Sequence, residues 1–269
     1  MRLIFTFLSL IVGHALSAQI QVTTLTEEFP GSGGVLLDAQ GNVYIANYGD
    51  GIQNANGSQI WRLTTDGNLG LYANGLSGAS GNAFDSQGNI FQSNISSGVV
   101  SKVDPEGNVT TFATTGITCP VGINIDADDN LYVCNCCGIF GNTIRKVSPN
   151  GVSTVFAASN LFNCPNGITR DNDDNLYISN FNNGAVIKVD PNGNASLLAN
   201  IPGNNNGHLT YSPQLNQLIV TSHGSSRIYL LSLSGVVSLL AGNGQRGNDD
   251  GGVDEATFSR PNGIAASPS

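Results

Sequence analysis

The chain has 269 residues, and its 19 aspartates and glutamates outnumber its 10 lysines and arginines, which gives a formal net charge of −9. This acidic balance argues against nucleic acid or an anionic membrane surface as a partner. Glycine accounts for 34 residues and only 11% of residues are charged, a composition that suits many short strands joined by tight turns.

The N-terminus has the pattern of a secretory signal peptide. An apolar run, Leu3–Leu16, follows Arg2 and ends in the small residues Ser17-Ala18. This run is too short for a membrane span, and no later run approaches the length that a span needs. We therefore expect residues 1–18 to be removed, residues 19–269 to form one domain, and the protein to be secreted or periplasmic.

One sequence pattern recurs along the rest of the chain. The clearest copies are Val121–Asn135 and Asn166–Asn180, and a degenerate fifth copy ends with Leu218–Ser222. Each copy has a short apolar segment, a turn that opens with Asp, and a second apolar segment that closes with Asn. The closing residues are Asn47, Asn94, Asn135 and Asn180. A repeat of about 45 residues predicts an all-β chain folded as a β-propeller, with one blade per repeat.

Each repeat supplies the four strands of a blade, which we call a to d from the propeller axis outward. In the fourth repeat we expect them at Gly167–Arg170, Leu176–Ser179, Ala185–Val189 and Ala195–Ala199. Turns rich in Asp, Asn and Gly separate them. No helical apolar period is sustained after the signal peptide, which supports an all-β fold.

The two ends of the chain carry partial copies of the repeat. Gln21–Leu25 resembles a strand d, and we expect residues 21–29 to complete the last blade. Asn262–Ala266 resembles the strand a of a sixth copy. The sequence therefore predicts a six-bladed propeller with four-stranded blades, whose blades one to five are complete and whose sixth blade is incomplete because the chain is a fragment. The alternative is a five-bladed ring that closes directly.

The end of the fifth repeat carries a family resemblance. The segments Leu240–Gly251 and Ala256–Ala265, together with the Asp…Gly-Asn-Leu-Tyr-Val pattern, resemble the NHL-repeat propellers. They are also similar to the neighbouring gluconolactonase-like and strictosidine-synthase-like six-bladed propellers. These families include lactone hydrolases, lyases and interaction modules, so the resemblance implies the fold and leaves the activity open.

The resemblance to the lactonases implies a divalent metal on the axis, held by a Glu in the first blade, two Asn and a catalytic Asp. Gly33 stands where the Glu is expected, and Asn206 stands where the acid is expected. Asn166, Asn206 and Asn262 remain as neutral ligands that could hold a divalent cation such as calcium. We assign no catalytic residue, because no carboxylate is in register.

One face of the ring collects the other unusual residues, because strands a begin and strands b end on the same face. The closing asparagines either cap a turn or contact a ligand there. Two histidines either have a structural role or bind a metal. The cysteines favour disulfides over a thiolate metal site, with two bridges, one thiol left over and the pairing open. These residues are Asn47, Asn94, Asn135, Asn180, His208, His223, Cys119, Cys134, Cys136, Cys137 and Cys164.

The sequence thus favours an exported binding module over an enzyme, and this module would hold a protein partner or a small polar ligand on this face. The first alternative is a metal-dependent lactone or ester hydrolase. The second alternative is a structural repeat module of a larger secreted protein.

Overall fold

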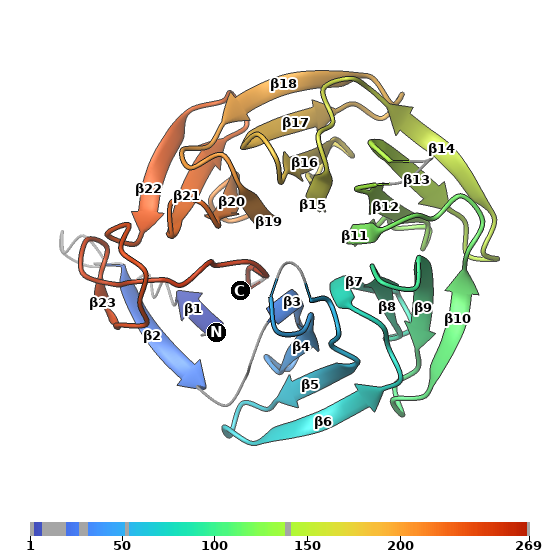
Figure 1. Cartoon of the computed structure of the whole chain (residues 1–269), viewed down its shortest axis with the longest axis horizontal. Helices are drawn as coiled ribbons and strands as arrows, with labels where there is room; N and C mark the ends of the chain where they lie inside the picture. The colour runs from blue at the N-terminus through green and yellow to red at the C-terminus, as the bar shows by residue number, and fades with distance from the viewer. Residues whose placement is uncertain (1–2, 7–19, 27–31, 52–53, 138–140, 268–269) are drawn as a thin grey trace.

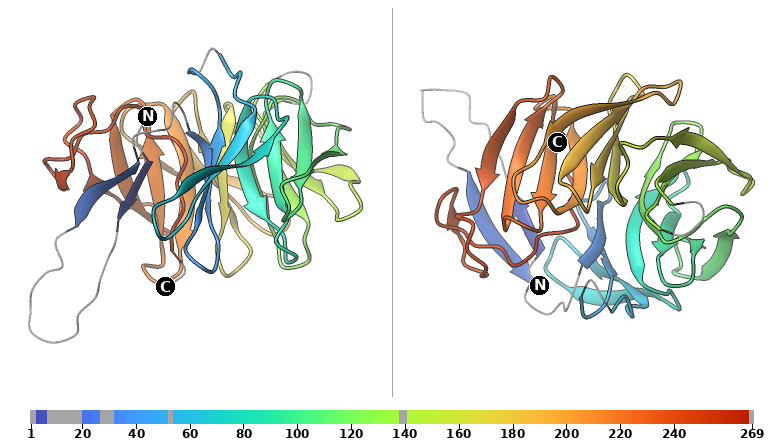
Figure 2. Two further views of the ribbon diagram at one scale, coloured as in Figure 1. Left: turned by 90° about the horizontal axis from the view of Figure 1, so that it is seen from below. Right: turned by 45° about the horizontal axis from the view of Figure 1, so that its top comes forward.

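The computed structural model describes residues 3–6, 20–26, 32–51, 54–137 and 141–267, and these form an all-β propeller (Figure 1). Five four-stranded antiparallel sheets surround a central axis. Seen from the side, the ring is a flat disc whose strands cross its thickness (Figure 2). The described residues contain no helix, so none could cross a membrane.

The blades follow one another along the chain, each with strand a innermost and strand d at the rim. Blade one contains β3 (Ser32–Leu37), β4 (Val43–Asn47), β5 (Gln59–Leu63) and β6 (Leu69–Asn74), and blade two contains β7 (Ala79–Phe84), β8 (Ile90–Asn94), β9 (Val99–Val103) and β10 (Val109–Ala113). Blade three contains β11 (Pro120–Ile125), β12 (Leu131–Asn135), β13 (Thr143–Val147) and β14 (Ser153–Ala158). Blade four contains β15 (Pro165–Arg170), β16 (Leu176–Asn180), β17 (Ala185–Val189) and β18 (Ala195–Asn200), and blade five contains β19 (Asn206–Ser212), β20 (Gln217–Ser222), β21 (Arg227–Ser232) and β22 (Val237–Ala241).

The repeated Asp and Asn residues build the turn between strands a and b. In blade four, Asp171 Oδ1 accepts hydrogen bonds from the backbone nitrogens of Asp173 and Asn175, both at 2.9 Å. The Asn175 amide and the Tyr177 hydroxyl each donate to Asp171 Oδ2, also at 2.9 Å. Burial acts to raise the pKa of Asp171, but these hydrogen bonds outweigh it and lower the pKa. The hydrogen bonds of the repeat motif therefore stabilise the turn between strands a and b.

The hydrophobic core is a ring of clusters between neighbouring blades. One cluster joins Tyr132 and Ile144 of blade three to Ile168, Ile178 and Ile187 of blade four. Aromatic side chains add edge-to-face contacts in the same layer, as between Tyr132 and Phe156, whose ring centroids are 4.9 Å apart. Since each blade buries its face only against its neighbours, the sector where the two ends of the chain meet has to be covered as well.

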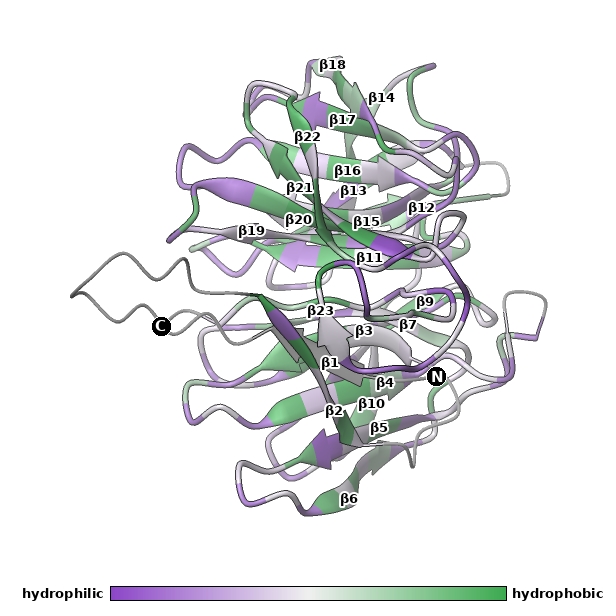
Figure 3. Cartoon of the chain, turned by 90° about the vertical axis from the view of Figure 1, so that its left-hand side faces the viewer, coloured by the Kyte–Doolittle hydropathy of each residue, from purple (hydrophilic) through white to green (hydrophobic). Residues whose placement is uncertain are grey.

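The prediction of six blades is wrong, because the structure has five four-stranded blades. A three-stranded sheet lies in the remaining sector, with β2 (Gln21–Thr26) between β1 (Leu3–Thr6) and β23 (Gly251–Gly252). Figures 1 and 3 show β2 at the rim between β22 and β6. Its Val22 is fully buried against Ile228 and Phe258. The predicted outer strand thus forms over residues 21–26, and residues 27–29 lie outside the described part of the chain.

The predicted strand over residues 262–266 is also absent. The segment lies between β19 and β3, because His208 N donates to Asn262 O at 3.1 Å and Asn262 Nδ2 donates to Ser32 O at 2.9 Å. Among the described residues no strand b lies beside it to form a ladder, so it follows the course of a strand a without becoming one. Blades one and five therefore do not pair directly, because this segment lies between their innermost strands.

The predicted signal peptide coincides with β1 over residues 3–6, which pairs with β2 in antiparallel orientation. The other residues of the 1–18 segment lie outside the described part of the chain.

Candidate functional site

A pocket of about 900 Å³ opens on the propeller axis, at the face where strands a begin. Every blade contributes to its wall, and so does the segment 242–267, which we call the closing segment. The starts of strands a provide Ser80, Val121 and Asn166, and the closing segment provides Asn262. We call this cavity the axial pocket.

The predicted amide ligands divide into two groups. Asn166 and Asn262 line the axial pocket, and the Nδ2 of each donates at 2.9 Å to a backbone carbonyl of the next sector, Asn206 O and Ser32 O. Asn206 does not line it. Its side chain is fully buried and donates to Ala185 O of blade four at 3.4 Å.

The position of Asn206 differs from the expected one by one residue. Asn206 pairs with Ser222 as Pro165 pairs with Asn180, so Asn206 is the equivalent of Pro165. The equivalent of Asn166 in blade five is therefore Gly207, which has no side chain to offer a ligand.

The closing asparagines hold the connections between blades. Asn94 Oδ1 accepts from Ser77 N at 2.9 Å, and the Nδ2 groups of Asn135 and Asn180 each donate at 2.8 Å to the carbonyls of Gly116 and Leu161. All three are buried, with at most 1% of their surface exposed. Asn47 instead accepts from Gly49 N at 3.0 Å in an Asx-type contact. None of the four is among the residues that line the axial pocket.

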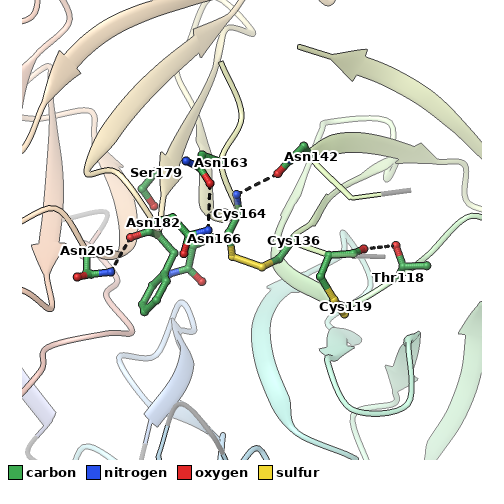
Figure 4. The surroundings of a disulfide bond; sticks show 12 residues. Thr118, Cys119, Cys136, Asn142, Asn163, Cys164, Asn166, Ser179, Asn182 and Asn205 are labelled. Atoms are coloured by element: carbon green, nitrogen blue, oxygen red, sulfur yellow. Dashed lines mark hydrogen bonds between the residues drawn. A yellow bond between two sulfur atoms is a disulfide. The ribbon is translucent and has the colours of Figure 1, made fainter. Parts of the chain in front are cut away.

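Two disulfides border the pocket, as predicted, and one thiol is left over. Cys119 bonds to Cys137 within blade three, and Cys136 bonds to Cys164 and thereby joins blade three to blade four (Figure 4). Cys134 is fully buried, and burial raises the pKa of its thiol, so it is an unreactive core residue.

The two histidines occupy different environments. His223 lines the axial pocket, where its ring centroid is 5.9 Å from that of Phe181. Burial and the nearby Arg260 and Arg246 lower the pKa of His223 to about 4. His208 lies behind the wall, where burial and His223 lower its pKa to about 4 and its Nε2 has no partner among the described residues. Both rings are therefore neutral at pH 7.

Two arginines, which the sequence analysis did not single out, also line the pocket. Arg246 and Arg260 face the same cavity as His223. Arg260 has a φ of 56° and precedes Pro261, just as Cys119 (φ 41°) and Cys164 (φ 52°) precede prolines at the starts of their strands. A comparison of this X-Pro position across the repeats would have found Arg260.

The residues of the pocket fit a divalent cation poorly. No three His, Cys, Asp or Glu side chains of the described residues lie together in a group that could hold a metal. Asp50 is the acid that lines the cavity, and the amides of Asn54 and Asn56 donate to its Oδ2 at 3.1 and 2.9 Å. Two guanidinium groups in the same wall would repel a cation.

No protein-family model and no curated protein matches the sequence. Among solved structures, virginiamycin B lyase from Staphylococcus aureus is similar at 17% identity, with a TM-score of 0.60 over 80% of this chain and 71% of that one. The gluconolactonase XC5397 from Xanthomonas campestris is similar at 14% identity, with a TM-score of 0.70 over 93% of this chain and 86% of that one. A chain of a nidogen/laminin complex is similar at 17% identity, with a TM-score of 0.65 over 80% of this chain and 86% of that one. At these identities the likenesses show the fold alone, so this chain has the architecture of the β-propellers.

Proposed function

We propose that this protein is a binding protein that takes a small polar ligand in the axial pocket. The observation that carries the proposal is the pocket of about 900 Å³. It lies on the face of the ring on which the sequence predicts the unusual asparagines and cysteines. Its volume is in the range of ligand sites, and it combines amide and guanidinium donors with the rings of Tyr48 and Phe181.

A ligand site also needs a rigid wall, and the disulfides supply one. The Cys136–Cys164 bond fixes blade three to blade four at the edge of the cavity. Two disulfides further support export to an oxidising compartment. We favour a small ligand over a protein partner because the polar groups converge in a concave site.

A metal-dependent hydrolase has less support. The hydrolase would need a carboxylate in the axial wall, but Gly33 and Gly207 occupy the strand-a positions where the resemblance expects acids. The sequence allowed an axial calcium ion, but this lining fits a cation poorly, so we expect no calcium-dependent rise in Tm below millimolar concentrations.

The proposal is tested by blocking the pocket. Asn248 is exposed and lines the cavity, whereas Asn192 is exposed in a turn on the opposite face. We expect small polar compounds that raise the Tm of the wild type to lose this effect in Asn248→Trp and to keep it in Asn192→Trp. The proposal fails if the stabilising compounds act equally on both variants, or if a broad panel contains none.

A further inference from the structure

We infer that the axial pocket is an anion site, in which Arg246 and Arg260 receive the carboxylate or phosphate group of a small organic ligand. The inference rests on the proposed function and names the chemistry of its ligand. It also replaces the cation that the family resemblance implies with a group of opposite charge.

The first observation is the charge of the wall. The chain has a net charge of −9, yet the charged side chains that line the cavity are two arginines and Asp50. The carboxylate of Asp50 already accepts hydrogen bonds from Asn54 and Asn56 in its own loop. Within the described part of the chain, neither guanidinium has a hydrogen bond or an ion pair. Both are therefore available to a ligand.

The second observation is that the loop carrying Arg246 is held in place. Arg227 donates to Gly242 O at 3.2 Å and to Asn243 O at 2.8 Å, which fixes the start of the loop. At its far end, the hydroxyl of Thr257 accepts from Asp249 N at 2.8 Å and donates to Asp249 Oδ2 at 2.9 Å. The closing segment therefore presents Arg246 from an ordered backbone, which lowers the entropy that binding costs.

The third observation is the backbone of Arg260. At the same repeat position blade two has Gly78 (φ 66°), a residue that adopts this conformation without strain. A non-glycine residue there costs on the order of 1 kcal/mol. Cys119 and Cys164 occupy the position in blades three and four, and each forms one of the disulfides beside the axial pocket. In the closing segment the position carries a guanidinium that lines the pocket.

His223, which is neutral at pH 7, lies near both arginines, and its ring centroid is 5.9 Å from that of Phe181. A neutral imidazole adds a hydrogen-bond donor without drawing in a cation. Guanidinium groups bind carboxylate and phosphate with paired hydrogen bonds, which gives the site direction as well as charge. The rings of Tyr48 and Phe181 would contact an apolar or ring portion of the same ligand.

The experiment compares three probes that share a benzene ring at constant ionic strength. Benzoate carries a carboxylate, phenyl phosphate carries a phosphate, and benzamide is the neutral counterpart of benzoate. Isothermal titration of the full-length chain should show that at least one anion binds and that benzamide binds at least about tenfold more weakly, which is about 1.4 kcal/mol. The stronger of the two anions identifies the group that the site prefers.

Variants then assign the binding to the two arginines. Arg246→Gln and Arg260→Gln should each weaken the preferred anion by about tenfold or more, and the double variant should abolish binding. Arg170→Gln is the matched control. It removes one positive charge as the other variants do, but Arg170 pairs with Asp174 in a turn on the opposite face. This control should bind like the wild type.

The histidine gives a second readout that a purely structural role of the arginines would not move. The charged groups near His223 are Arg260 and Arg246, and its titratable neighbour is His208. A bound anion favours the imidazolium form, so the pKa of His223 measured by NMR should rise from about 4 when the preferred anion is added.

Three results would overturn the inference. They are binding of benzamide as tight as that of the preferred anion, unchanged anion binding in the double variant, and the absence of binding by either anion. In the first case the pocket would still bind a ligand, so the proposed function would stand without the anion site.

Discussion

At the scale of single residues, buried hydrogen bonds contribute to the free energy of unfolding, and buried histidines make it depend on pH. Asp171 is buried, with 6% of its surface exposed, whereas the equivalent residues Asp38, Asp85 and Asp126 of the other blades are half-buried. Tyr177 beside it is fully buried. Because the Asp171 carboxylate is a charged acceptor, the hydrogen bond that it receives from the Tyr177 hydroxyl stabilises the folded chain.

The first prediction removes that hydroxyl. Tyr177→Phe deletes its 2.9 Å hydrogen bond to Asp171 and leaves the carboxylate one donor short. We expect the free energy of unfolding in urea to fall by about 1.5–3 kcal/mol, the range for a hydrogen bond to a charged group. The control is Tyr211→Phe, whose hydroxyl donates to Asn216 at an exposed site, and its effect should be smaller. Equal effects would show that the buried carboxylate does not depend on this donor.

The second prediction concerns acid pH. Burial lowers the pKa of His208 from 6.5 to about 4, so between these values the unfolded chain binds a proton that the folded chain does not. The free energy of unfolding is therefore highest above about pH 6.5, where His208 is neutral in both states. It falls by up to about 3 kcal/mol as the pH falls toward 4. His208→Gln should flatten this slope in urea unfolding. A pKa near 6.5 assigned to His208 in the NMR titration of the wild type would contradict the prediction even if the variant does not fold.

At the scale of elements, the Cys136–Cys164 disulfide ties two blades, whereas Cys119–Cys137 lies within one blade. The two bonds close loops of similar length, with sequence separations of 28 and 18 residues, so the entropy that each removes from the unfolded chain is similar. Their difference lies in what they hold together, because only the first bond spans an interface between blades.

The third prediction compares the two bonds. Replacing both partners of either bond with serine should lower the free energy of unfolding by about 2–4 kcal/mol. Only the Cys136→Ser/Cys164→Ser pair should also increase hydrogen exchange at the junction of β12 and β15. Counting thiols without reductant should give one in denaturant and none in the native protein, because Cys134 is buried. Five free thiols in denaturant would contradict both bonds.

At the scale of the whole molecule, the two ends of the chain meet in the sector between blades five and one. Val22 of β2 and Phe258 of the closing segment belong to one buried cluster with Ile228 and Leu240. The ring is therefore held by contacts between residues that are far apart in sequence. The same segment carries the arginines of the axial pocket, which links the closure of the ring to the shape of the site.

The fourth prediction tests this closure. Phe258 is 3% exposed, and Phe258→Ala should lower the free energy of unfolding by about 3–5 kcal/mol through the cavity that it leaves. Leu197 on the rim is 53% exposed, and Leu197→Ala should have a much smaller effect in the same urea titration. Similar losses in the two variants would mean that the closing segment does not stabilise the ring.

The repeat made the blades predictable because each Asp-to-Asn turn is a local signal. The signal fails in blade five, where Ser212 stands at the position of the repeat Asp, and this is why Asn206 was placed one residue out of register. The sixth blade was predicted from the partial copies at residues 21–25 and 262–266, but a strand depends on a partner that a local pattern does not reveal. Arg246 belongs to no repeat, so only the folded chain shows that it meets Arg260 and His223 at the pocket.

The most direct test of the account is a crystal structure of the protein with the anion that binds best in the titration, benzoate or phenyl phosphate. We predict that its carboxylate or phosphate lies in the axial pocket within hydrogen-bond distance of Arg246 and Arg260, with its ring toward Phe181. An anion bound on another surface, or in the pocket but beyond the reach of both guanidinium groups, would contradict the account.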